Sequence, residues 1–193
     1  GYRAAYRRKL DWLREHDPVN GAEIARLGSE MLTCENRRRE IAEALASGRT
    51  ALALAEDACK ELASAENWGT WDVFGGGLLA DAIKHDKLQN AQRTIYSLQN
   101  ALSGFRTELA DVGSISADLT VTIDGFMNFA DYFFDGLFAD WTVLNRIRDS
   151  LAHVRGVSGD IESVLHRLAA LDDTEQQKND RLQAALDRLV RAE

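Results

Sequence analysis

Apolar residues recur at alternating steps of three and four along the first long stretch of the chain. Ten of the twelve positions on this line are apolar; Arg38 and Gly48 are the exceptions. The line runs through Ile24, Leu27, Met31, Cys34, Arg38, Ile41, Leu45, Gly48, Leu52, Ala55, Cys59 and Leu62. A sustained seven-residue repeat with Arg- and Glu-rich flanks is typical of a coiled coil. We therefore expect a coiled-coil helix over about residues 22–66.

A short helix precedes this element, and a second seam follows it. Pro18 and Gly21 interrupt the pattern, so we expect residues 1–17 to form a separate short N-terminal helix. Asp86 and Gln89 have the spacing of a capping box, which predicts that the next helix starts at Asp86. Its seam is wholly apolar and consists of Leu88, Ala91, Ile95, Leu98, Leu102, Phe105, Leu109 and Val112.

The C-terminal part of the chain predicts two further helical stretches. Apolar spacing over 137–154 predicts the first, and Gly156 and Gly159 are expected to interrupt it. The last seam consists of Ile161, Val164, Leu168, Leu171, Glu175, Lys178, Leu182, Ala185 and Leu189, of which Glu175 and Lys178 are polar. Residues 115–123 alternate apolar with polar, as a strand does, but a lone strand has no partner, so we expect an extended connector.

Together these patterns predict an all-α fold. We expect an antiparallel helical bundle of about four helices in which two long helices extend as a coiled-coil stalk. Residues 22–193 would form a single helical domain. Its stalk would consist of helices 22–66 and 157–192, with an acidic, aromatic head of residues 67–155.

Charge is unevenly distributed along the chain, and this distribution excludes some classes of binding partner. The 193-residue chain has a formal net charge of -8, and residues 66–140 carry four basic against eleven acidic side chains. No basic surface for a phosphate backbone is apparent, so we expect no nucleic-acid partner. The acidic segment would be repelled by anionic lipid, and no apolar run is long enough to span a bilayer, so we expect no membrane partner.

The run Arg37-Arg38-Arg39 is the densest basic cluster. It is flanked by Glu35, Glu40 and Glu43. We interpret the run as a solvated helix face.

Residues 67–77, Asn-Trp-Gly-Thr-Trp-Asp-Val-Phe-Gly-Gly-Gly, are the most unusual stretch. Gly75, Gly77 and Ala80 match a degenerate dinucleotide fingerprint, but a helix precedes them where a strand is required. We expect a structural turn in which the glycines let the chain pass beneath large aromatic side chains. Trp68, Trp71 and Asp72 are the candidate interaction residues of this turn.

The stretch Asp-Gly-Phe-Met-Asn-Phe-Ala-Asp-Tyr-Phe-Phe-Asp-Gly-Leu-Phe-Ala-Asp-Trp, residues 124–141, offers carboxylates for a hard metal. On a helix, Asp131 and Asp135 would share one face, one turn apart. Asp140 and His85 are further candidate ligands. Because the stretch fails the EF-hand ligand pattern, we favour structural roles, such as helix caps or ion pairs, for these side chains.

The two cysteines, Cys34 and Cys59, lie on seam positions of one predicted helix. They would be about 37 Å apart, whereas a disulfide needs Cα atoms within about 7 Å. We therefore expect both to be free thiols.

Two runs, Glu-Asn-Trp-Gly-Thr-Trp-Asp-Val-Phe-Gly-Gly-Gly (66–77) and Asp-Tyr-Phe-Phe-Asp-Gly-Leu-Phe-Ala-Asp-Trp (131–141), carry a resemblance to a known family. The resemblance covers about residues 41–171, which are similar to the C-terminal part of a family of long bacterial coiled-coil proteins of unknown activity. The resemblance implies a cytoplasmic bacterial protein, with a longer coiled coil upstream. It implies no activity.

These observations favour a non-catalytic scaffold or assembly protein, with no cofactor. The expected partner is another protein or a second copy of the chain, held through the coiled coil and the helical head. The alternative is a metal- or small-ligand-binding function in the acidic head, in which the ligands would be Asp72, His85, Asp131, Asp135 and Asp140.

Overall fold

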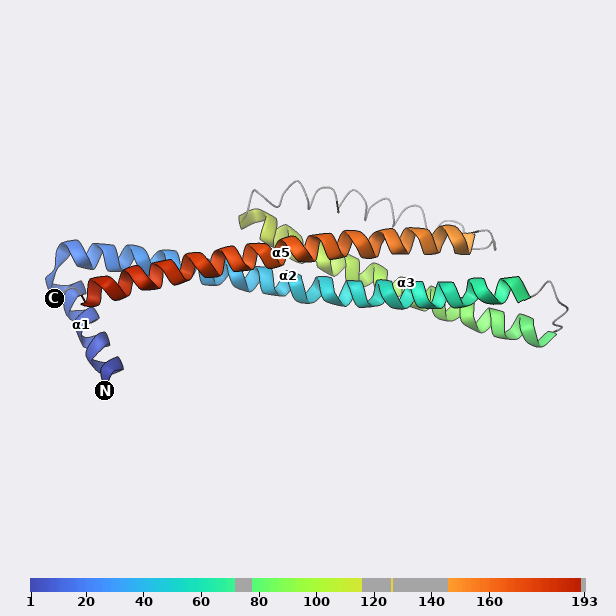
Figure 1. The fold of residues 1–193 in the computed structure, drawn as a ribbon, viewed down its shortest axis with the longest axis horizontal. Helices are drawn as coiled ribbons and strands as arrows, with labels where there is room; N and C mark the ends of the chain where they lie inside the picture. Colours follow the sequence, from blue (N-terminus) through green and yellow to red (C-terminus); the bar gives the residue numbers. More distant parts are fainter. Residues whose placement is uncertain (72–77, 116–125, 127–145, 192–193) are drawn as a thin grey trace. The chain divides into compact units, whose positions relative to one another are not determined.

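The computed structural model describes residues 1–71, 78–115, 126 and 146–191. Within these ranges every element is a helix: α1 (Tyr2–His16), α2 (Pro18–Trp71), α3 (Leu78–Ile115) and α5 (Arg146–Arg191) (Figure 1). The predicted all-α helical bundle is thus confirmed. The extended connector was expected over residues 115–123; Ile115 is instead the last residue of α3, and residues 116–123 lie outside the described residues.

The short N-terminal helix is confirmed as α1, but α2 begins four residues earlier than predicted, at Pro18. The backbone N–H groups of Val19 and Asn20 donate to Asp17 Oδ1 at 3.1 and 3.0 Å, which caps the new helix. Proline is well suited to the first helical position, because its missing N–H would have no partner there. Pro18 therefore starts α2 and does not merely end α1.

The predicted limits around residues 67–86 are wrong in two places. Helix α2 continues through residues 67–71, where a turn was predicted, and ends at Trp71. Helix α3 begins at Leu78 and not at Asp86. Residues 78–85 are rich in strong helix formers and contain no proline, so nothing local delays the start of the helix.

The break predicted at Gly156 and Gly159 is also wrong, because α5 is one helix over Arg146–Arg191. A glycine inside a helix costs only about 1 kcal/mol relative to alanine. The flanking residues Val154, Val157 and Ile161 are buried, and their packing offsets this cost. Residues 146–154 of that predicted stretch and the last predicted helix are therefore one element, and residues 137–145 lie outside the described residues.

The chain divides into two compact units. Unit 1 comprises Gly1–Ala42 and Ala169–Glu193, and unit 2 comprises Glu43–Leu168. The predicted partition into a stalk (22–66 and 157–192) and a head (67–155) places the limits elsewhere. That partition stays a prediction, because much of the head lies outside the described residues.

The core of unit 2 forms where α2 meets both α3 and α5. A Cβ added to Gly48 of α2 would lie 2.8 Å from Leu165 Cδ2 of α5 and from Phe105 Cε2 and Cζ of α3. The Phe105 ring packs edge-to-face on Phe126, with 5.3 Å between centroids. The α3 seam is confirmed wherever side chains are described, because its residues from Ile95 to Val112 are at most 1% exposed.

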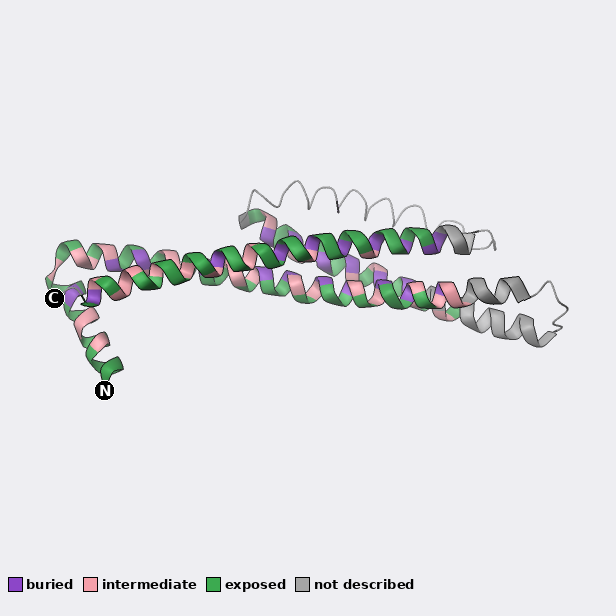
Figure 2. Cartoon of the chain, in the orientation of Figure 1, coloured by how far each residue is buried: buried purple, intermediate pink, exposed green. Residues whose placement is uncertain are grey.

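The first predicted seam is confirmed along α2, since every one of its twelve positions is buried or half-buried (Figure 2). In unit 2, however, the buried face is wider than one seam. Three alanines that the seam omitted, Ala44, Ala51 and Ala58, are fully buried. Because two helices pack on α2 there, a second line of small residues turns inward.

The core of unit 1 forms where α1 packs on the ends of α2 and α5. Leu13, Ile24 and Val190 are its buried centre, and Tyr6 and Leu10 are among the half-buried residues packed on it. The three central residues come from three different helices. Helix α1 is therefore part of unit 1 and is held by apolar contacts.

Candidate functional site

The described part of the chain includes three of the sequence-predicted site residues. Trp68 and Trp71 lie in the last turns of α2, and His85 lies in α3. The other candidates, Asp72, Asp131, Asp135 and Asp140, lie outside the described residues. Within the described ranges, no group of three or more His, Cys, Asp or Glu side chains is placed to hold a metal ion. A metal site in the acidic head stays a prediction.

A cluster of polar side chains between α2 and α5 in unit 1 is the most distinctive arrangement that the structure describes. We call it the polar layer. It consists of Cys34, Arg37 and Arg38 of α2 and Asp172, Glu175 and Gln176 of α5. Nearer the start of α2, Ile24 packs with Val190 near the end of α5, whereas Arg38 contacts Asp172, so residue numbers rise along α2 as they fall along α5. The two helices are therefore antiparallel in this unit.

Glu175 is the innermost carboxylate of the polar layer. It continues a line of buried positions at seven-residue spacing, Val154, Ile161 and Leu168, and is itself only 7% exposed. Arg37 donates to Glu175 Oε1 at 3.1 Å. Glu175 Oε2 is buried with no hydrogen-bond partner among the described residues. A buried carboxylate with one unsatisfied oxygen reduces stability relative to an apolar residue of similar size.

Arg38 forms the second contact between the helices in the polar layer. Its Nε donates to Asp172 Oδ1 at 2.7 Å and its NH2 group donates to Oδ2 at 3.2 Å, while NH1 donates to Gln176 Oε1. The hydrogen bonds that Arg38 donates to the Asp172 carboxylate raise the pKa of Arg38. A two-pronged Arg–carboxylate contact has strict geometry, so it defines which residues of the two helices lie opposite one another.

The Arg37-Arg38-Arg39 run is therefore not the solvated face that we expected. Arg37 and Arg38 are half-buried and reach across to α5. Only Arg39 is exposed, and it pairs with Glu40 on its own helix. The expectation failed because the acidic partners of Arg37 and Arg38 lie more than a hundred residues away, on α5.

The thiol of Cys34 lies beside the Glu175 carboxylate and is fully buried. Burial, and then the neighbouring carboxylate, raise its pKa. Burial also raises the pKa of Cys59, which is half-buried. Both cysteines are free, as predicted. A thiol with a raised pKa has little thiolate near neutral pH and is therefore a poor nucleophile and metal ligand.

A further polar contact ties α1 to α5. Tyr6 donates to Asp187 Oδ1 at 2.7 Å. Burial, followed by the bond to Asp187, raises the pKa of Tyr6 to about 12, and the same bond lowers the pKa of Asp187. This bond joins residues at opposite ends of the chain.

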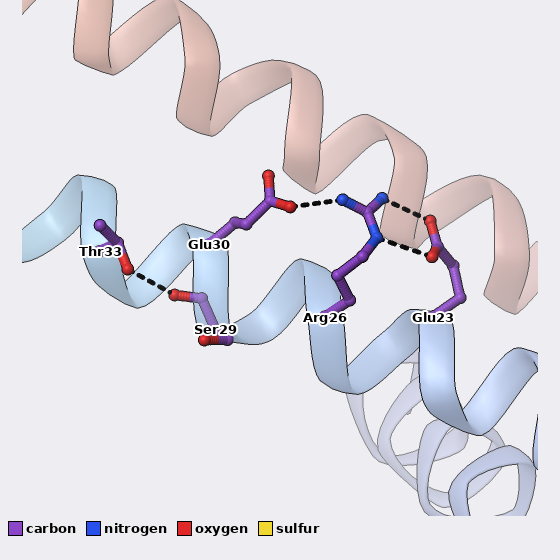
Figure 3. Close-up of polar contacts among 5 residues, drawn as sticks. All are labelled: Glu23, Arg26, Ser29, Glu30 and Thr33. Atoms are coloured by element: carbon purple, nitrogen blue, oxygen red, sulfur yellow. Dashed lines mark hydrogen bonds and ion pairs between the residues drawn. The ribbon is translucent and has the colours of Figure 1, made fainter.

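By contrast, the ion pairs near the start of α2 stay on one helix (Figure 3). The Arg26 guanidinium donates to Glu23 through Nε and NH2 and to Glu30 through NH1. All three side chains are exposed and lie one turn apart. Such pairs support a helix by a few tenths of a kcal/mol each and do not join α2 to another element.

Comparison with family models, curated proteins and solved structures finds no match to this chain. The resemblance to long bacterial coiled-coil proteins therefore stays a prediction. In the part of the chain that the structure describes, no helix combines the length and apolar character needed to cross a bilayer.

Proposed function

We propose that the protein is a non-catalytic helical scaffold that joins other proteins, or copies of itself. In this proposal, the paired stretches of α2 and α5 form an antiparallel coiled coil. The observation that carries it is a strict seven-residue repeat of buried positions along α2: Leu27, Cys34, Ile41, Gly48, Ala55 and Leu62. Such a repeat holds two helices together over many turns.

The placement of buried polar groups supports the same proposal. Ligand sites bring several polar side chains together in a concave pocket. Among the described residues, the buried polar or charged side chains are Ser150 and Glu175, both on α5. Glu175 lies in the seam with α2, and Ser150 shares seven-residue spacing with the buried Val157 and Val164. These groups support helix pairing rather than the binding of a small molecule.

The proposed location is the cytoplasm. Cys34 and Cys59 are both free thiols. Because they lie about 37 Å apart along one helix, they would not pair with each other in any compartment, and the proposed location rests on the resemblance to long bacterial coiled-coil proteins.

Site-specific photo-crosslinking in cells tests the scaffold function. A photoreactive benzoylphenylalanine replaces Leu32, which is 58% exposed on α2, and in a second variant Val19, which is 79% exposed. We expect irradiation to join the chain to a protein neighbour or to a second copy. The matched control is Leu32→Phe, which has a similar ring and no photoreactive group.

The scaffold proposal would be abandoned if neither position yields a protein adduct and the purified chain sediments as a monomer at every concentration. Thermal denaturation with added divalent metal or with chelator tests the alternative, a metal site in the acidic head. A metal-dependent rise in melting temperature, combined with the absence of adducts, would favour that alternative.

A further inference from the structure

Helix α1 has a second line of residues at seven-residue spacing, beside the line that packs in unit 1. Tyr6, Leu10 and Leu13 form the packed line. Five other residues recur at steps of three and four and lie on one side of the helix, within an arc of about 80°. They are Tyr2, Ala5, Lys9, Trp12 and His16, and we call them the outer seam of α1. Lys9 is half-buried and the other four are exposed, so unit 1 leaves this side of α1 largely open.

Large aromatic rings dominate the outer seam. Tyr2 is 66% exposed and Trp12 is 55% exposed. Trp12 stacks on His16, with 5.2 Å between ring centroids, and Tyr2 lies 6.4 Å from the ring of Tyr6, which packs on the core of unit 1. The outer seam is therefore continuous with that core. Exposed Tyr and Trp side chains of this kind are enriched at protein interfaces.

Two side chains of opposite charge, Arg8 and Glu15, lie along one edge of the outer seam. Both are exposed, and neither forms an ion pair in the part of the chain that the structure describes. They are seven residues apart, whereas ion pairs along one helix join residues three or four apart. A second α1 helix that runs antiparallel to the first would bring Glu15 of one copy beside Arg8 of the other. The edge is thus complementary in charge to itself.

We propose that the outer seam packs against the outer seam of a second copy of this chain, with the two α1 helices antiparallel. In this dimer Ala5 lies opposite His16 of the second copy, and Lys9 lies opposite Trp12. The small Ala5 leaves space for the imidazole ring, and the Lys9 ammonium group meets the face of the indole in a cation–π contact. Each contact occurs twice, because a two-fold axis relates the copies.

The flanking charges select this alignment of the two helices. Arg8 faces Glu15 of the second copy, and the symmetric pair forms beside it. If one helix were shifted by a seven-residue repeat, Arg8 would face Arg8 of the second copy, and the like charges would repel. The opposite edge of the outer seam adjoins Tyr6 and Leu13, which are already packed in unit 1. Charge complementarity is therefore confined to the edge that is free.

This inference rests on the proposed scaffold function and names a surface through which two copies join. The contact involves two helices of 15 residues each, which places it at the small end of specific interfaces. We therefore expect a dissociation constant in roughly the micromolar range. Association should weaken with added salt, because ions screen the exposed charge pairs.

Sedimentation velocity of the full chain over a range of concentrations tests the charge pairs. Arg8→Glu and Glu15→Arg each place like charges opposite one another, so each should weaken self-association by roughly tenfold. The double variant restores opposite charges in exchanged positions and should recover the wild-type association. Arg7→Glu is the matched control, because Arg7 is exposed on the side of α1 away from the outer seam, and it should leave association nearly unchanged.

The melting temperature separates this role from a structural one. Arg8 and Glu15 are exposed and unpaired within the described part of a single copy, so neither single variant should lower the melting temperature of the monomer. Trp12→Ala should weaken self-association with a small change in melting temperature, because much of the ring is exposed. A lower melting temperature in the single charge variants, together with a double variant that does not recover association, would overturn the proposal.

Isotope-mixed photo-crosslinking tests the alignment. Chains with benzoylphenylalanine in place of Trp12 are mixed with ¹⁵N-labelled unmodified chains and irradiated. We expect adducts with ¹⁵N-labelled α1 at Lys9 or its immediate neighbours. Adducts elsewhere, adducts only within one chain, or binding to anionic phospholipid vesicles without self-association would each overturn the proposal. A chain that sediments as a monomer, yet still gives adducts from Leu32 or Val19 to another protein in cells, would remove this surface and leave the scaffold function intact.

Discussion

Replacing Gly48 with alanine probes the closest approach of helices in unit 2. The added methyl group would lie 2.8 Å from Leu165 Cδ2 and from two ring carbons of Phe105, well inside the 3.5–4.0 Å of a favourable carbon contact. Leu165 is half-buried and can turn aside. Phe105 is fully buried and packed on Phe126, so its ring has no space to move into.

Two opposing effects determine the stability of Gly48→Ala. Alanine is favoured over glycine inside a helix by about 1 kcal/mol. Forcing a methyl group into a filled core costs about 1–3 kcal/mol. Because the overlap involves a fixed ring, we expect the packing cost to exceed the helix gain, with a net loss of about 1–2 kcal/mol.

Gly159→Ala is the matched control, since a Cβ there meets nothing within 4 Å and the residue is exposed on α5. It should gain about 0.5–1 kcal/mol. Urea denaturation followed by circular dichroism measures both free energies of unfolding. Phe105→Leu should relieve part of the Gly48→Ala loss in the double variant, because the two residues contact each other. A Gly48→Ala protein at least as stable as Gly159→Ala would refute this packing argument.

Three further predictions concern the polar contacts and the thiols. Tyr6→Phe should lower the free energy of unfolding by about 1 kcal/mol. Folding raises the pKa of Tyr6 from 10.0 to about 12, so the stability of the wild-type protein should fall as the pH rises from 10 to 12, and urea titrations at each pH should show a smaller fall in the variant. Cys59 should react faster than Cys34 with a thiol reagent, which can be measured on variants that each keep one cysteine and carry serine at the other position. If both cysteines react at the rate of the unfolded chain, the burial of Cys34 is contradicted. Glu175→Leu combined with Arg37→Leu, which replaces both members of the pair, should raise the free energy of unfolding by about 1 kcal/mol or more, whereas a clear loss in urea denaturation would show that the pair stabilises the fold.

The helices and their seams could be predicted because the seven-residue repeat is a local property of the sequence. Ile95, Leu102 and Phe105 were placed in a seam by spacing alone, and all are buried. The prediction failed where packing overrides a local signal. Gly156 and Gly159 were expected to break a helix, yet α5 continues through them, because a penalty of about 1 kcal/mol per glycine is smaller than the gain from burying the neighbouring apolar residues.

The polar layer could be predicted only in part. The polar character of Glu175 within an apolar seam was visible in the sequence, and its seven-residue spacing from Leu168 was the available signal. Its partner could not be predicted, because Arg37 lies on another helix far away in the chain. Local spacing identifies which side of a helix faces inward, but not which residue of another helix lies opposite.

The two units use different means to hold α2 against α5. In unit 2, Gly48 lets Leu165 of α5 approach α2 closely, and a shift by one seven-residue repeat would set Ile41 or Ala55 in its place. In unit 1, a shift of the same size would place Glu175 against apolar residues and break its contact with Arg37. A buried polar group of this kind reduces stability but selects one alignment. Close apolar packing therefore provides the stability of the pair, and the fit at Gly48 and the polar layer together determine the alignment in which the two helices meet.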